Sequence, residues 1–344
     1  MHFKPSHTAI AFWSLASASV YLLAILVFIV APHRTESDLT VFYYRWAVSL
    51  KPDTSPYPPL VLLVIKPLAY FSLIKAFWLW TAVNLILFFS ALMLLVGWNP
   101  ILIAFGIFYA PLLDELFWGQ SDPILLFALA VAVYYVASER YALSSAAIAA
   151  AGFIKIFPFA AFGYFVAARQ WRAVAWSLIA ILTGIVLSVA TLGIDRNRSF
   201  IVHLFSSRTS YCAFCLFWST RKTDLSLSVG FAYLFRSTRM VQMSVIVITI
   251  GLILLACYAT WKRRIERDWA ACSLWVAVAT ALSPVNEFHH LLLLLIPFAG
   301  IVRHSRGREF WLVVFSYALA EVALVAMSVW WNTWESEGQI WIWL

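Results

Sequence analysis

Long uninterrupted runs of apolar residues restrict the folds that this sequence can adopt. A helix needs about 20 predominantly apolar residues to cross the hydrocarbon core of a bilayer. Runs near that length cover residues 9–31, 76–97, 100–117, 123–138, 172–193, 243–261, 268–283, 288–302 and 310–331. Charged residues make up only 12% of the chain and hydrophobic residues 63%, whereas a soluble domain carries about 25% charged residues. The sequence therefore predicts a polytopic membrane protein and excludes a soluble enzyme, a disordered chain and a disulfide-rich scaffold.

Two further apolar stretches are interrupted by polar residues and proline. Residues 142–168 contain Lys155 and Pro158, and the stretch is long for one helix and short for two. Because proline breaks a helix and a lysine inside a membrane needs a polar cavity, we predict two short helices that meet at this point. Residues 58–74 contain Lys66 and Pro67 and either span or lie in the interface; we favour an interfacial helix.

The predicted fold class is thus an all-α polytopic membrane protein of about eleven transmembrane helices. It forms a single integral-membrane domain over residues 1–344, and the run over 9–31 is interpreted as a retained span, since no small-residue cleavage site follows it.

The distribution of basic residues predicts which side each loop faces. The chain carries a net charge of +8, and nucleic acid binding is a less fitting explanation than the positive-inside bias of membrane proteins. With the N-terminus inside, the inner turns are 139–141, 169–172, 262–268 and 303–309. They carry Arg140, Arg169, Arg172, Lys262, Arg263, Arg264, Arg267, Arg303, Arg306 and Arg308. The two long loops, 32–75 and 194–242, then lie outside.

Polar side chains gather at four places on this predicted outer side. They are segments 36–45 and 57–59, segments 114–115 and 118–123, Lys155 between the two half-spans, and segment 283–290. A charged side chain near the bilayer centre costs about 3 kcal/mol on insertion scales, so such groups tend to face a cavity. Their convergence on one face is the main functional signal of the sequence.

Each of these groups also has a purely structural interpretation. Asp38 suits an ordinary loop acid. Tyr43, Tyr44 and Tyr57 suit an interfacial aromatic belt. Gln120 and Asp122 suit a helix start before Pro123, and the arginines of loop 194–242, Arg236 among them, suit solvated loop charge.

Lys155 is harder to explain by structure alone, and for His289 and His290 a hydrogen-bonding or proton-handling role is favoured over a metal site. A lysine in an apolar stretch needs a carboxylate, a carbonyl or an anionic ligand. Adjacent residues of an α-helix point about 100° apart, which disfavours joint metal ligation by His289 and His290. Cys212 and Cys215 form one C-x-x-C without a second pair, so a local disulfide or a filler role is favoured over zinc.

The chemistry of these groups suits transfer to a hydroxyl. The sequence has no G-x-S-x-G elbow, H-E-x-x-H motif or phosphate-binding Walker loop. A carboxylate can deprotonate an acceptor hydroxyl while nearby cations hold a phosphate leaving group. A lipid-phosphate-linked donor would place its tail in the bilayer and its reacting head at this face.

The order of the motifs resembles that of a known family. Asp38 precedes the run Val41-Phe42-Tyr43-Tyr44 and then Tyr57-Pro58-Pro59-Leu60. Later come Gly119-Gln120-Ser121-Asp122, Ile154-Lys155-Ile156-Phe157-Pro158 and Ser283-Pro284-Val285-Asn286-Glu287-Phe288-His289-His290. Together these segments resemble glycosyltransferase family 87, the polyprenyl-phosphate-mannose-dependent mannosyltransferases of the GT-C fold superfamily. The sequence departs from the family pattern at Glu287, where an aromatic residue is expected, and at Asp122, where the family often has Asn.

The resemblance implies a GT-C-type bundle with interfacial helices in the first outer loop and an inverting hexosyltransferase. Asp38 would be the general base. Donor phosphate binding would fall to Lys155, His289, His290 and Arg236, and sugar or acceptor binding to Tyr43, Tyr44, Tyr57, Gln120, Asp122 and Glu287. No metal and no cofactor beyond the lipid-linked sugar donor would be needed. The acceptor would be a glycolipid, a glycan or a protein, and the enzyme would lie in a bacterial cytoplasmic membrane with its site facing the periplasm or exterior.

Three other functions compete with this interpretation. A transporter or flippase also places charge near the midplane, but it predicts an internal repeat that the sequence does not show. An acyl- or phospho-transferase would use the two histidines without explaining Asp38, Gln120 and Lys155. A structural assembly subunit would not need a lysine within a span.

Overall fold

A computed structural model describes residues 37–49, 57–97, 109–205, 237–262, 268–283 and 288–304, with a few isolated positions between and beyond them. Every regular element in these ranges is a helix, which confirms the all-α prediction. The predicted span over 9–31 and nearly all of the span over 310–331 lie outside the described residues.

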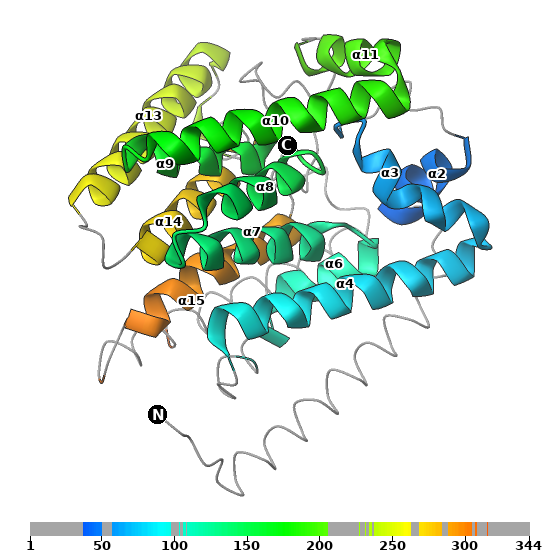
Figure 1. Cartoon of the computed structure of the whole chain (residues 1–344), viewed down its shortest axis with the longest axis horizontal. Coiled ribbons are helices and arrows are strands. Elements are labelled where there is room, and N and C mark those ends of the chain that lie inside the picture. Colours follow the sequence, from blue (N-terminus) through cyan, green and yellow to red (C-terminus); the bar gives the residue numbers. More distant parts are fainter. Residues whose placement is uncertain are drawn as a thin grey trace, which may run out of the picture.

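Four helices that run side by side form the centre of the protein (Figure 1). They are α4 (Leu73–Val96), α7 (Asp122–Ala137), α8 (Tyr141–Gly152) and α10 (Trp171–Leu192). Each contacts the next in that order, and α7 and α8 are joined by a tight turn. The predicted spans over 76–97, 123–138 and 172–193 correspond to three of these helices within a few residues.

A second group of helices packs against this row. It consists of α13 (Thr238–Lys262), α14 (Asp268–Ala281), the 3-10 helix η5 (Phe288–Leu294) and α15 (Leu295–His304). α14 contacts α7, α13 and α15, so it connects the row to the later part of the chain. This arrangement brings η5 against α7 although more than a hundred residues separate them in sequence.

The stretch over 142–168 is broken where the sequence predicts. α8 ends at Gly152, and a 3-10 helix, η4 (Phe157–Phe162), begins only after Lys155 and Ile156. Pro158 lies in the first turn of η4, where its missing N–H has no helical partner to lose. The short helix α9 (Gly163–Ala167) completes the stretch. Lys155 therefore projects from an irregular segment between two short helices, as predicted.

The first loop and the segment before α7 also contain short helices. The first loop consists of the π-helix η2 (Leu39–Tyr44), α2 (Arg45–Ser49), α3 (Val61–Ile65) and the 3-10 helix η3 (Lys66–Tyr70). Residues 61–70 rise about 15–20 Å, which is less than the ~30 Å hydrocarbon core. This segment is thus too short to span alone, and its location in the interface stays a prediction. Helix α6 (Ala110–Trp118) precedes α7.

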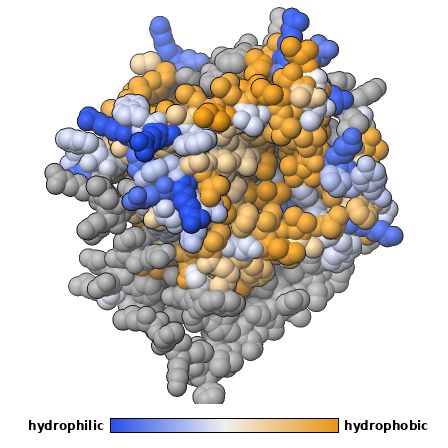
Figure 2. Space-filling model, viewed as in Figure 1, coloured by the Kyte–Doolittle hydropathy of each residue, from blue (hydrophilic) through white to orange (hydrophobic). Residues whose placement is uncertain are grey.

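The outer surface of the bundle is apolar, as a membrane protein requires. α4, α10 and residues Arg239–Lys262 of α13 are long and apolar enough to cross a bilayer, and the other described apolar helices are shorter. Leu178, Leu182 and Val186 recur every four residues on α10 and are exposed, so they form one apolar face. Figure 2 shows a broad apolar surface with hydrophilic residues gathered toward its edges. The total of about eleven spans stays a prediction.

Candidate active site

The turn between α6 and α7 forms the centre of the candidate site. Gly119 ends α6 with φ of +66°, a left-handed conformation that glycine adopts without steric cost. Two side chains of α4 bind the turn: Trp80 Nε1 donates to the carbonyl oxygen of Gly119 at 2.9 Å, and Asn84 Nδ2 to that of Gln120 at 3.0 Å. The side chains of Gln120 and Asp122 are both fully buried, and α4 fixes the backbone that carries them.

Gln120 connects the first loop to this turn. Its amide nitrogen Nε2 donates to Asp38 Oδ2, and its Oε1 accepts a hydrogen bond from the Tyr43 hydroxyl at 3.0 Å. The Tyr43 hydroxyl also lies 3.1 Å from Ser121 Oγ. Both ends of one amide are therefore bound by side chains of the first loop, which places Asp38 beside the turn.

The π-helical turn explains how Asp38 and Tyr43 reach the same amide. Residues five positions apart in an α-helix point about 140° apart. A π-helix bonds residue i to residue i+5, which brings two such residues onto nearly the same face. η2 begins directly after Asp38 and includes Tyr43, so this local geometry presents both side chains to Gln120.

The three predicted tyrosines do not share one environment. Tyr43 is fully buried, and its ring packs against Trp80 and Tyr57 at centroid distances of 5.6 and 5.5 Å. Burial raises the pKa of Tyr43 well above its usual value, so its hydroxyl remains a donor at neutral pH. Tyr44 instead donates to the carbonyl oxygen of Phe71 at 2.8 Å, within the first loop. Tyr43 and Tyr57 thus lie in the cluster, whereas the Tyr44 hydroxyl bonds within the first loop.

Lys155 extends from the break before η4 into the same cluster. Its ammonium nitrogen lies 2.8 Å from Asp122 Oδ1, 2.9 Å from His290 Nε2 and 3.5 Å from Gln120 Oε1. It also lies 5.9 Å from the centroid of the Tyr57 ring, within range of a cation–π contact. The sequence predicted that a lysine here needs a partner, and the structure supplies a buried carboxylate.

The two histidines of η5 have different closest partners, and the Nε2 atom of each lies 3.9 Å from Asp122 Oδ2. His289 Nδ1 lies 3.2 Å from Asp114 Oδ2, and the other oxygen of Asp114 accepts a hydrogen bond from Trp118 Nε1 at 3.1 Å. His290 contacts Lys155 and packs edge-on against Phe157 at a centroid distance of 5.5 Å. Asp114 of α6 therefore orients the His289 ring, while Lys155 binds the His290 ring.

Two buried carboxylate oxygens in the cluster accept no hydrogen bond within the part of the chain that the structure describes. They are Asp122 Oδ2 and Glu115 Oε2. Glu115 uses its other oxygen to accept a bond from the Asp122 backbone N–H at 2.8 Å. An unsatisfied buried acceptor costs about 1–3 kcal/mol, so these two oxygens can accept bonds from the hydroxyls of a ligand.

The same cluster contains a group that could hold a metal ion. Asp122, His289 and His290 each offer a ligand atom, and these atoms lie within 4.8 Å of one another. The two rings lie with their centroids 4.6 Å apart, although adjacent residues of a 3-10 helix project about 120° apart, so the side-chain conformations bring the rings together. The ammonium of Lys155 already contacts two of the three side chains. The expectation that the site uses no metal stays a prediction.

Some predicted residues lie outside the described part of the chain, and some contacts were not predicted. Arg236, Glu287, Cys212 and Cys215 are outside it. The roles of Trp80, Asn84 and Ser121 were missed. The role of Asn84 could have been predicted, since an amide inside an apolar span commonly forms a hydrogen bond to another helix. The role of Trp80 could not, because a tryptophan in an apolar run is equally compatible with simple core packing.

Comparison with known proteins identifies the family. The profile of glycosyltransferase family 87 matches residues 56–284, which is more than half of the chain. This segment includes Tyr57, Gln120, Asp122 and Lys155, whereas Asp38 and the two histidines lie just beyond its ends. Searches of curated proteins and of solved structures find no match. The chain belongs to glycosyltransferase family 87, and it is a membrane glycosyltransferase.

Proposed function

We propose that this glycosyltransferase moves a hexose, with mannose as the expected sugar, from a polyprenyl-phosphate donor to an acceptor hydroxyl, with inversion at the anomeric carbon. The observation that carries the proposal is the amide of Gln120. One end of it binds Asp38, and its other end lies 3.5 Å from the ammonium of Lys155. A candidate base and a candidate phosphate-binding cation are thereby held beside one another.

Asp38 is the proposed general base. The acceptor oxygen forms a bond to the anomeric carbon as its proton passes to the Asp38 carboxylate. At the same time the bond from that carbon to the phosphate oxygen breaks, and its electron pair stays on the leaving polyprenyl phosphate. Asp38 is partly buried and keeps one carboxylate oxygen bound to Gln120, which orients the other for this role.

Lys155 is the proposed main stabiliser of the leaving phosphate. Negative charge grows on the phosphate as the bond breaks, and a fixed cation in a site shielded from water stabilises that charge strongly. His290 contacts the ammonium and His289 lies next to His290, so both could supply further donors, and Arg236 would complete the proposed set. Asp122 and His290 hold Lys155 in place before the donor arrives.

The sugar or acceptor would occupy the space next to Asp122, Gln120 and Tyr57. Asp122 Oδ2 is a buried acceptor that a sugar hydroxyl can satisfy. The rings of Tyr43 and Tyr57 offer apolar faces beside it. Glu287 and Tyr44 remain proposed contributors to this region. The acceptor would be a glycolipid, a glycan or a protein.

The enzyme would lie in a bacterial cytoplasmic membrane with this site toward the periplasm or exterior. The basic turns predicted to face inward lie at the opposite ends of α7, α8 and α10 from Asp122 and Lys155. A lipid-linked donor, membrane lipids and an acceptor would be its partners, without nucleic acid and without a cofactor.

Donor choice tests the proposal. Membranes with the full-length protein are offered radiolabelled polyprenyl-phosphate-mannose, polyprenyl-phosphate-glucose or nucleotide-linked mannose, with a crude lipid extract as acceptor. We expect label to move only from polyprenyl-phosphate-mannose, with or without a metal chelator. Transfer from the nucleotide sugar alone would refute a lipid-linked donor. Transfer from the glucosyl donor alone would show that the sugar is glucose and not mannose. Loss of transfer in the presence of the chelator would overturn the prediction that no metal is needed.

A further inference from the structure

A pocket lies at the other end of the bundle from the candidate active site. Its volume is about 890 Å³, and its lining comes from the α7–α8 turn, the α9–α10 turn and the first turns of α8 and α10. Sixteen residues of α7 separate the two sites along one helix, which corresponds to about 24 Å. The catalytic proposal uses none of the residues that line this pocket.

Two equivalent turns build the pocket. Glu139 and Arg169 both adopt a positive φ, of 54° and 57°. Each is followed by a residue whose N–H closes the preceding helix: Arg140 bonds the Tyr135 carbonyl, and Gln170 bonds the Phe165 carbonyl, both at 2.9 Å. Since α8 and α10 pack together, the two turns lie next to one another.

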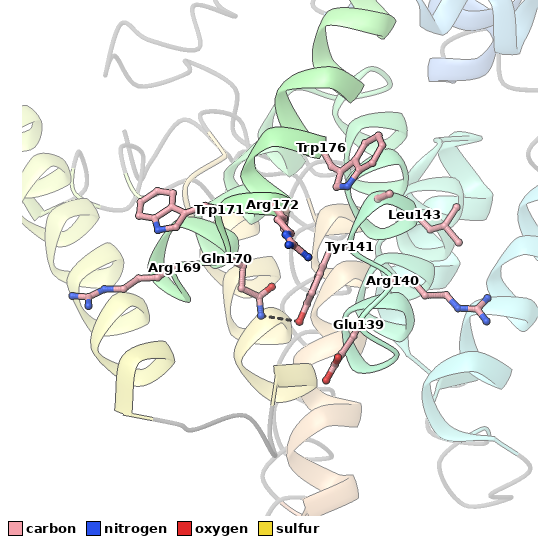
Figure 3. Close-up of a pocket in the computed structure, with 11 residues that line it drawn as sticks. Glu139, Arg140, Tyr141, Leu143, Arg169, Gln170, Trp171, Arg172 and Trp176 are labelled. Carbon is pink, nitrogen blue, oxygen red and sulfur yellow. Dashed lines mark hydrogen bonds between the residues drawn. The ribbon is translucent and has the colours of Figure 1, made fainter.

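The pocket has a polar floor and a basic rim. Gln170 Nε2 donates to the Tyr141 hydroxyl at 2.9 Å, and the oxygen Oε1 of Gln170 is buried without a hydrogen-bond partner among the described residues. Arg172 extends toward these two side chains, while Arg140 and Arg169 extend outward on opposite sides (Figure 3). The lining contains three arginines and one acid, Glu139, so it carries a clear excess of positive charge.

Two exposed tryptophans place the pocket at the level of lipid headgroups. Trp171 and Trp176 also line it, and they are 66% and 46% exposed. Tryptophan is enriched at the boundary between headgroups and hydrocarbon, and the apolar face of α10 begins just beyond these two residues. A ligand of this pocket can therefore have an anionic head at the arginines and acyl chains along the bundle.

We propose that this pocket binds the headgroup of an anionic phospholipid that carries a free hydroxyl, of the phosphatidylglycerol type. Arg172, with Arg140 and Arg169 at the rim, binds the phosphate, and the unsatisfied Gln170 Oε1 accepts the headgroup hydroxyl. The positive-inside bias alone accounts for the presence of these arginines. It does not account for Arg172 pointing into a cavity toward Gln170, whose Oε1 is buried without a hydrogen-bond partner among the described residues.

Native mass spectrometry of the full-length protein in mild detergent tests this proposal. The protein is titrated with phosphatidylglycerol, with phosphatidic acid, which lacks the headgroup hydroxyl, with zwitterionic phosphatidylcholine, and with free glycerol phosphate. We expect phosphatidylglycerol to bind best. Arg172→Gln should weaken it about five-fold, the effect of removing one surface cation near a lipid phosphate, and Gln170→Leu should remove the preference over phosphatidic acid.

Arg239→Gln is the matched control, since Arg239 is an exposed arginine of α13 outside this pocket. The Arg239→Gln variant should bind phosphatidylglycerol as tightly as the wild type does. Equal weakening by Arg172→Gln and Arg239→Gln would overturn the proposal in favour of diffuse surface charge. Binding of glycerol phosphate as tightly as the lipid would overturn the lipid assignment. If Arg172→Gln does not fold, Arg172→Lys takes its place, and unchanged affinity for the lipid would then contradict a forked arginine–phosphate contact.

Discussion

The ammonium nitrogen of Lys155 lies 2.8 Å from a carboxylate oxygen of Asp122, and the two side chains are 6% and 0% exposed. Removing two charges from water is costly, and the cost is offset only when each charge has a well-placed partner. Each side chain therefore depends on the other to remain charged while buried, and the pair keeps a cation at the centre of the cluster.

Neutralising the lysine should affect folding and transfer differently. Lys155→Met leaves Asp122 as a buried carboxylate without its cation, which should lower the free energy of unfolding by about 3–5 kcal/mol. Lys155→Met with Asp122→Asn removes both charges and should recover much of that loss in a detergent thermal-unfolding assay. We expect transfer from the lipid donor to remain lost in the double variant. Recovery of transfer together with stability would show that Lys155 has only a structural role.

The Tyr43 hydroxyl should contribute to the orientation of Gln120. Tyr43→Phe keeps the ring but removes the 3.0 Å bond to Gln120 Oε1, at a cost of about 1 kcal/mol, so transfer should fall about five-fold. Tyr134→Phe is the matched control, because Tyr134 is an exposed residue of α7 that no proposed contact of the site involves. Initial rates of the two variants check this prediction, and equal rates would argue against a role for the Tyr43 bond.

Gly119 should tolerate no side chain because the first loop packs against it. A Cβ there would meet the Leu39 Cβ at 2.8 Å, and φ is +66°. We expect Gly119→Ala to displace the loop that carries Asp38 and to abolish most transfer. Gly97→Ala also has a positive φ, of +61°, but its Cβ would meet nothing within 4 Å. We expect Gly97→Ala to lower the unfolding temperature while the folded fraction still transfers sugar. Loss of transfer in both Gly119→Ala and Gly97→Ala would point to general unfolding instead.

Sidedness can be measured with single cysteines in a background without the four native ones. Ser72 and Ser138 are exposed and lie before α4 and after α7, at opposite ends of the bundle. In intact cells, a membrane-impermeant thiol reagent should label Ser72→Cys and leave Ser138→Cys unlabelled until the membrane is permeabilised. Labelling of Ser138→Cys alone in intact cells would reverse the proposed orientation.

The sequence predicted the elements whose signals are local. Apolar runs predicted α4, α7 and α10, and the lysine and proline at 155 and 158 predicted the break between α8 and η4. The need of a buried lysine for a partner also follows from one position in the chain. Its identity does not, since Asp122 and His290 reach Lys155 only through the packing of α7 and η5.

The contacts that the sequence did not predict depend on geometry between elements. The π-helical turn that aligns Asp38 with Tyr43 has no distinct signature in the letters Leu-Thr-Val-Phe-Tyr-Tyr. The approach of the His289 and His290 rings, with centroids 4.6 Å apart, depends on side-chain conformation, because adjacent residues of a 3-10 helix project about 120° apart. The pocket between the α7–α8 and α9–α10 turns forms only because two turns thirty residues apart in sequence pack together. The sequence assigned the arginines of both turns to one side of the membrane but did not predict that contact.

The most direct test of the account is the transfer rate of Asp38→Asn with a polyprenyl-phosphate-sugar donor. The amide keeps the shape of the side chain but cannot take a proton, so transfer should fall by about 10²–10⁴-fold while expression and thermal stability stay unchanged. Asp195→Asn, the same change at an exposed acid of helix α11 (Ile194–Phe205), should transfer sugar at the wild-type rate. Wild-type activity in Asp38→Asn would contradict the account and direct the search for the base to Glu36, Asp114 or Asp122.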